Sequence, residues 1–158
     1  MAVTVMEKSQ VTMSKNKMEL IAEIGQAHDG SLGILHSYID VLANTGIDTV
    51  KFQVHIAAAE SSPEEPFRVP FSYEDATRFE RMELSEEHWR EIKSHCEDKG
   101  LKFLASPFSI AAVDLLENIG LERYKIGSGE VTNALILEKI ARTGKPIILS
   151  SGMSSFDE

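Results

Sequence analysis

Three ionisable side chains stand inside short apolar runs of this sequence, where a purely structural protein would carry Val or Ile. They are Glu23 in LIAEIG, Lys51 in TVKFQ and Lys125 in RYKIGS. Burying an unpaired charge is costly, so such residues are expected to pair with each other or to bind a ligand. Two lysines and one carboxylate predict a locally cationic pocket for a small anion. The same residues also fit a structural ion pair between Glu23 and one lysine.

Serines recur where three successive apolar runs end. Ser106 occurs in ASPF, Ser128 in IGSGE, and Ser150 with Ser151 in LSSGM. Hydroxyls and glycine-flanked backbone N–H groups donate hydrogen bonds to phosphate, so this recurrence favours a phosphate-bearing ligand. Each serine taken alone could instead cap a following helix.

A second carboxylate and two histidines are expected near the same pocket. Glu130 lies just beyond the Ser128 turn and could serve in general acid–base chemistry, or else favour a helix N-terminus. His28 and His55 follow apolar runs and could contact a ligand. No spacing of His, Asp and Glu predicts a metal site within this chain.

The composition limits the classes of partner. The 158 residues carry 16 Lys and Arg against 25 Asp and Glu, a net charge of −9, which disfavours nucleic acid and anionic membranes. No apolar run approaches the roughly 20 residues of a membrane span, and residues 1–17 lack the apolar core of a secretory signal. The single cysteine, Cys96, excludes an internal disulfide and a Cys-cluster metal site. We therefore expect a cytoplasmic protein.

Five apolar runs are expected to form the strands that position these residues. Their nearly continuous apolar character is typical of strands buried on both faces of a parallel sheet, and they span 20–25, 49–53, 101–105, 124–127 and 146–150. We expect the three charged residues near the carboxyl ends of their strands, converging on one mouth. The connection of about thirty residues between Gln53 and Ser85 is long enough to indicate a functional loop.

The stretches between the runs have helical spacing and end at glycines. Ser85 and Ser109 are placed to cap two of these helices, and Tyr38, Trp89 and Leu135 are expected on inward faces. The resulting order of strands and helices fits an open doubly wound sheet or the first five strands of a (β/α)8 barrel. A whole barrel needs about 250 residues, so a barrel here would be a partial one.

Five motifs, in their order along the chain, resemble the sialic acid synthases. This is the N-acetylneuraminate synthase family, with the related legionaminate and pseudaminate synthases. The motifs are IAEIGQAHDGS (21–31), VKFQ (50–53), FLASPF (103–108), YKIGSGE (124–130) and PIILSSGM (146–153). The resemblance covers about residues 19–155.

The resemblance implies an α/β fold, a (β/α)8 TIM barrel truncated here to about its first five strands. We expect residues 1–18 to form a flexible tail and 19–158 to form the N-terminal portion of the barrel. The remaining strands and an antifreeze-like C-terminal domain would be absent. In the family that domain crosses to the partner subunit, which implies a homodimer when complete.

The resemblance also implies an enzyme of carbohydrate biosynthesis. It would condense phosphoenolpyruvate with an N-acetylated amino sugar such as N-acetylmannosamine, giving a nonulosonic acid and phosphate. In the family mechanism, C3 of phosphoenolpyruvate attacks the sugar aldehyde, water adds at C2, and phosphate leaves with C–O cleavage. A divalent metal, Mn²⁺ or Mg²⁺, belongs to the complete enzyme, with its ligands expected beyond Glu158. The piece alone is expected to be inactive.

Carried over by motif, the residues that would hold the phosphate and carboxylate of phosphoenolpyruvate are Lys51, Ser106, Lys125, Ser128 and Ser150. Glu23 would act as an acid–base group near the reacting carbons or the metal-bound water. Glu130 would contact the sugar and assist proton transfer. Gln53, on the same strand face as Lys51, would line the pocket.

Two alternatives stay open on the sequence. A barrel lysine, Lys51 or Lys125, could form a Schiff base with a ketone, as in class I aldolases. The chain could also be an inactive truncated remnant. In either barrel interpretation, two unpaired sheet edges would promote aggregation or self-association.

Overall fold

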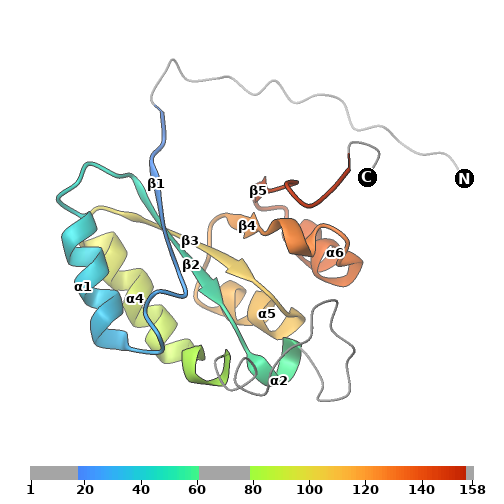
Figure 1. Ribbon diagram of the computed structural model, residues 1–158, viewed down its shortest axis with the longest axis horizontal. Coiled ribbons are helices and arrows are strands. Elements are labelled where there is room, and N and C mark those ends of the chain that lie inside the picture. Colours follow the sequence, from blue (N-terminus) through green and yellow to red (C-terminus); the bar gives the residue numbers. More distant parts are fainter. Residues whose placement is uncertain (1–17, 61–78, 156–158) are drawn as a thin grey trace, which may run out of the picture.

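The computed structural model describes residues 18–60 and 79–155 (Figure 1). Its strands form one parallel sheet in the order β1-β2-β3-β4-β5. They are β1 (Ile21–Gly25), β2 (Thr49–Val54), β3 (Lys102–Pro107), β4 (Tyr124–Ile126) and β5 (Ile147–Leu149). A doubly wound sheet reverses its strand order at a switch point, whereas this order is strictly sequential. The chain therefore has the wall of a (β/α) barrel, as expected.

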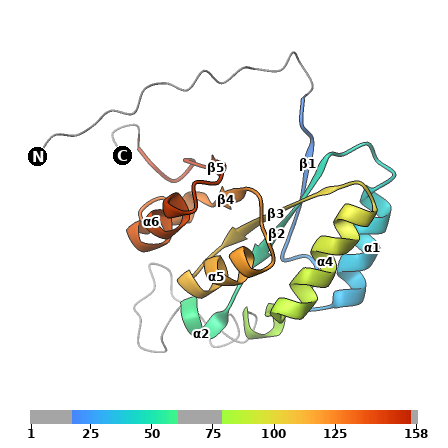
Figure 2. The ribbon, with the colours of Figure 1, turned by 180° about the vertical axis from the view of Figure 1, so that it is seen from behind.

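Four longer helices connect the strands or follow them. They are α1 (Leu32–Leu42), α4 (Glu86–Asp98), α5 (Ile110–Asn118) and α6 (Ala134–Arg142). Helices α1 and α4 lie side by side, as do α5 and α6 (Figures 1 and 2). Two short helical segments follow strands, α2 (Ala57–Glu60) after β2 and the 3₁₀ turn η1 (Ser128–Glu130) after β4. Within the described ranges, none of the helices combines the length and apolarity needed to cross a bilayer.

Strand β2 shows how the core and the site divide between the two faces of the sheet. Val50, Phe52 and Val54 are completely buried in the hydrophobic cluster. The ring of Phe52 stacks on Phe103 at 5.0 Å between centroids and meets Trp89 edge-on at 5.9 Å. Because side chains alternate along a strand, the residues between them point to the other face of the sheet.

The predicted helix caps are confirmed, whereas two residues predicted on inward helix faces are exposed. Ser85 accepts a hydrogen bond from the His88 N–H, and Ser109 accepts one from the Ala112 N–H. Tyr38 and Leu135 were expected inward but are 38% and 71% exposed. Each stands one residue from a buried position, and one residue turns a helix by about 100°.

Three boundary predictions are corrected by the structure. Strand β3 continues to Pro107, so Ser106 lies inside the strand rather than after it. Lys51 is the third residue of a six-residue strand and is not at its carboxyl end. The long connection predicted as a loop contains α2 and a helical stretch at 79–82. Its part at 61–78 lies outside the described residues, as does the predicted tail at 1–17.

Candidate functional site

Glu23 and Lys51 are paired across the first two strands. The β1–β2 register sets them opposite each other, and Lys51 Nζ lies 2.7 Å from Glu23 Oε2. The lysine side chain is 7% exposed, whereas the carboxylate side chain is 52% exposed. The pair is thus not sealed in the interior: it neutralises a buried ammonium and leaves a carboxylate open to solvent.

Lys125 joins this pair from β4. Its ammonium donates to the Ile126 carbonyl oxygen at 2.8 Å and to the Ser150 hydroxyl. Burial lowers the pKa of Lys125, the positive charge of Lys51 lowers it further, and the carboxylate of Glu23 opposes both. The structure therefore brings the three predicted charges near one another. An anion placed among them would relieve the repulsion between the two ammonium groups.

Ser106 contributes a buried hydroxyl without a partner. The β2–β3 register sets it beside Gln53, and it is 1% exposed. Its Oγ makes no hydrogen bond to any of the described residues. Leaving a buried hydroxyl unpaired costs on the order of 1–3 kcal/mol, and a ligand oxygen would remove that cost.

Ser128 and Glu130 lie on the turn after β4. Both belong to η1, whose N-cap is Gly127, while Asn133 caps α6 through the Ile136 N–H. Ser128 is therefore not a helix cap here. Glu130 accepts a hydrogen bond of 2.9 Å from the Asn133 amide. Among the contacts of the described residues, none joins Glu130 to Lys51 or Lys125, so the structure keeps this carboxylate with α6.

His55, at the end of β2, makes contacts that the sequence predicted only in part. His55 is buried, with Nδ1 2.9 Å from Glu60 Oε2 and Nε2 2.7 Å from Gln26 Nε2. Its ring stacks on Phe108 at 4.4 Å and 10°. The sequence singled out His55 but not Gln26, Glu60 or Phe108, since these contacts depend on strand register and on the course of α2.

His28 packs beside the turn between β1 and α1. It is buried, its Nδ1 accepts a hydrogen bond from the Gly30 N–H, and its ring meets Trp89 edge-on at 6.2 Å. Burial lowers its pKa, and the nearby His55 lowers it further, while Asp29 raises it. The residue is thus packed under the β1–α1 turn, and its buried Nε2 makes no hydrogen bond to the described residues.

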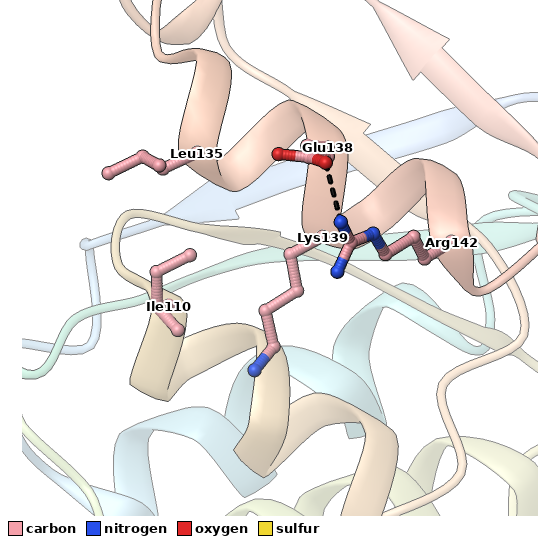
Figure 3. Close-up of a pocket in the computed structure, with 5 residues that line it drawn as sticks. All are labelled: Ile110, Leu135, Glu138, Lys139 and Arg142. Carbon is pink, nitrogen blue, oxygen red and sulfur yellow. Dashed lines mark hydrogen bonds and ion pairs between the residues drawn. The ribbon is translucent and has the colours of Figure 1, made fainter.

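The charged site around Glu23, Lys51 and Lys125 holds no metal-binding group among the described residues, and it shares no lining residue with the surface pocket. Within residues 18–60 and 79–155, no group of three or more His, Cys, Asp or Glu side chains could hold a metal ion. The residues present thus do not fit a metal centre by themselves. An open pocket of about 400 Å³ lies between α5 and α6 (Figure 3), lined by Ile110, Leu135, Glu138, Lys139 and Arg142.

Comparisons with known sequences point to one family. The sequence model of the NeuB family matches residues 38–158. The chain is 35% identical over 148 residues to the N,N'-diacetyllegionaminic acid synthase of Campylobacter jejuni, covering 90% of this chain and 44% of that protein. It is 34% identical over 145 residues to human N-acetylneuraminate-9-phosphate synthase, covering 87% and 40%. The chain thus spans less than half the length of these relatives.

Solved structures show the same likeness. The N-acetylneuraminic acid (sialic acid) synthetase of Leptospira borgpetersenii, solved with citrate, matches with a TM-score of 0.80 at 29% identity. That match covers 90% of this chain and 47% of the solved chain. A truncated 3-deoxy-D-arabino-heptulosonate 7-phosphate synthase from Thermotoga maritima matches with a TM-score of 0.57 at 12% identity, covering 83% and 39%. This second likeness concerns the fold alone.

Proposed function

Because the chain belongs to the NeuB family, we propose that it is the N-terminal part of a synthase that condenses phosphoenolpyruvate with an N-acetylated amino sugar. The products would be a nonulosonic acid and phosphate, for carbohydrate biosynthesis. The observation that carries the proposal is the meeting of Lys51, Lys125 and the open carboxylate of Glu23 on adjacent parts of one barrel wall.

The proposed ligand matches the charges of the site. Phosphoenolpyruvate carries a phosphate and a carboxylate, and the site offers two ammonium groups within a chain of net charge −9. A local cationic cluster can draw in a small anion against the overall charge. The groups proposed to hold this ligand are Lys51, Gln53, Ser106, Lys125, Ser128 and Ser150. The two sequence relatives are named for different sugar acids, so residues that bind the sugar are expected to differ between them. We therefore assign these groups to phosphoenolpyruvate rather than to the sugar.

The proposed reaction forms one C–C bond and, at C2, exchanges the C–O bond to phosphate for one to the oxygen of water. C3 of phosphoenolpyruvate attacks the sugar aldehyde, whose oxygen takes up a proton. Water adds at C2, and phosphate leaves from C2 to give the keto acid. Glu23, with an exposed carboxylate beside Lys51, would hold the proton that water gives up. Glu130 would contact the sugar.

The complete enzyme would need more than this chain provides. We propose that a divalent metal, Mn²⁺ or Mg²⁺, is held by ligands outside these residues, and no step above depends on it. We also propose that the complete enzyme is a cytoplasmic homodimer acting on small molecules. The piece alone is proposed to bind phosphoenolpyruvate without turning it over.

The binding step can be tested on the chain itself by isothermal titration with phosphoenolpyruvate. Lys51→Ala and Lys125→Ala should each weaken binding at least about tenfold, as expected when a charge-assisted hydrogen bond is removed. The matched control is Lys99→Ala, because Lys99 lies at the end of α4 and pairs there with Asp40 of α1. No binding by the folded chain, or an equal loss in the control, would contradict the proposal.

One observation also supports a second candidate, a Schiff-base aldolase. The pKa of Lys125 is lowered by burial and by Lys51, which is how an amine nucleophile is activated. Borohydride trapping with pyruvate separates the two functions. A stable adduct on Lys51 or Lys125 would favour the aldolase, and its absence beside tight phosphoenolpyruvate binding would favour the synthase.

A further inference from the structure

His55 is buried, and both of its ring nitrogens have polar neighbours. Nδ1 lies 2.9 Å from Glu60 Oε2, and Nε2 lies 2.7 Å from Gln26 Nε2. The ring is enclosed by Phe108 and by Phe79, whose centroid is 4.8 Å away. A histidine buried in this way can influence a ligand only through its neighbours.

The contacts determine which nitrogen carries the proton. A carboxylate only accepts hydrogen bonds, so Nδ1 must donate to Glu60. The other oxygen of Glu60 accepts from the Ile56 N–H at 2.8 Å, which fixes the carboxylate in place. Nε2 is then an acceptor, and the Gln26 amide nitrogen donates to it. Hydrogen bonds therefore run in one direction, from Gln26 through His55 to Glu60.

Gln53 lies next to this chain of hydrogen bonds. Its Oε1 is 3.5 Å from His55 Nε2, but with Nε2 as an acceptor both atoms only accept, so no hydrogen bond joins them. The Gln53 Nε2 is 3.8 Å from the position that a Cβ on Gly25 would take, and Glu23 Oε1 is 3.2 Å from the same position. Gln53 and Glu23 therefore both lie against Gly25.

We propose that His55, oriented by Glu60, is a positioning residue that fixes the side-chain amide of Gln26 at the mouth, where an anionic ligand would lie beside Gln53. The inference rests on the proposed function for the identity of that ligand. The arrangement of the amide can be tested without it.

The competing explanation is that His55 only fills space between two phenylalanine rings. Two substitutions separate these roles, because a Gln amide reaches the position of Nε2 whereas an Asn amide reaches that of Nδ1. Both His55→Gln and His55→Asn remove the ring. Only His55→Gln keeps a partner for Gln26. A space-filling role would make the two variants equivalent.

The direct readout is nuclear magnetic resonance of the chain with labelled His and Gln side chains. We expect the Nδ1–H tautomer of His55 in the wild type. The Gln26 amide signals should be retained in His55→Gln and move to those of a solvent-exposed glutamine in His55→Asn. Glu60→Gln, which keeps the ring and its packing, should populate the other tautomer. An Nε2–H tautomer in the wild type, or unchanged Gln26 signals in both His55→Asn and Glu60→Gln, would overturn the inference.

Titration with phosphoenolpyruvate then links the arrangement to the site. Binding should weaken about fivefold in His55→Asn, the loss expected for one hydrogen bond, and much less in His55→Gln. Equal affinities for the wild type and both variants would overturn the inference while leaving the proposed function intact. No binding by the wild type would count against the proposed function, and the resonance experiment would still decide the role of His55.

Discussion

Glu19 and Arg123 hold the starts of β1 and β4 together through two hydrogen bonds of 2.7 and 2.8 Å. Thr49, at the start of β2, donates to the same carboxylate at 2.6 Å. A flat sheet would separate β1 from β4 by three strand spacings of about 4.8 Å each. The ion pair bridges them directly, so the wall is curved at the end opposite the proposed site.

Acid should weaken this contact. The pKa of Glu19 falls from 4.5 to about 2, mainly because Arg123 donates hydrogen bonds to it and next because Thr49 does. A lowered carboxyl pKa stabilises the fold above the unfolded-state value of about 4.3, and that contribution disappears as the pH falls toward 2. Glu19→Gln should therefore cost about 1–2 kcal/mol at pH 7, a figure reduced for partial solvent exposure.

Urea unfolding between pH 2 and pH 7 measures this effect. The difference between wild type and Glu19→Gln should shrink as the pH drops below about 4.3. The control is Glu138→Gln, because Glu138 forms an exposed pair with Arg142 on α6 and should change stability much less. A difference between wild type and Glu19→Gln that stays constant with pH would contradict the assignment.

Glu23→Gln should act in opposite directions on stability and on anion binding. It leaves the buried ammonium of Lys51 without its carboxylate, which should cost on the order of 1–3 kcal/mol. It also removes a negative charge from beside both lysines, so inorganic phosphate should bind several-fold more tightly. Glu130→Gln is the matched control, since Glu130 bonds to Asn133, and it should leave phosphate affinity unchanged. Weaker phosphate binding in Glu23→Gln would be the contrary result.

Ser106→Ala should not lower the stability of the free chain, but it should weaken the complex with phosphoenolpyruvate. The Ser106 hydroxyl is buried with no described partner, so removing it should leave the melting temperature unchanged or raise it. Ser109→Ala offers the contrast three residues further along the chain, because that serine caps α5 and its loss should cost about 1 kcal/mol. Thermal melts with and without phosphoenolpyruvate measure both effects. Destabilisation of the free chain by Ser106→Ala would show that the hydroxyl already has a structural partner.

The parts predicted from sequence are those set by local chemistry. Charges inside apolar runs marked Glu23, Lys51 and Lys125, and the serine caps followed from residue type and spacing. Contacts that depend on strand register could not be predicted, because a run of apolar residues does not determine which residue of the next strand lies opposite. The contact between Gln26 and His55 is of this kind.

Edge strands β1 and β5 should make the chain associate with itself. Within the described residues, β1 pairs only with β2 and β5 only with β4, and apolar side chains stay exposed on both edges, including Leu149 at 53%. Unpaired strand edges recruit other strands, and a lysine at an edge opposes this. Leu149→Lys should therefore shift the chain toward monomer in sedimentation velocity runs across a concentration series. Leu135→Lys, on an apolar residue of α6 that is 71% exposed and lies away from any strand edge, should not. A wild-type chain that stays monomeric at every concentration, with a sharp cooperative melt, would show that these edges are already protected.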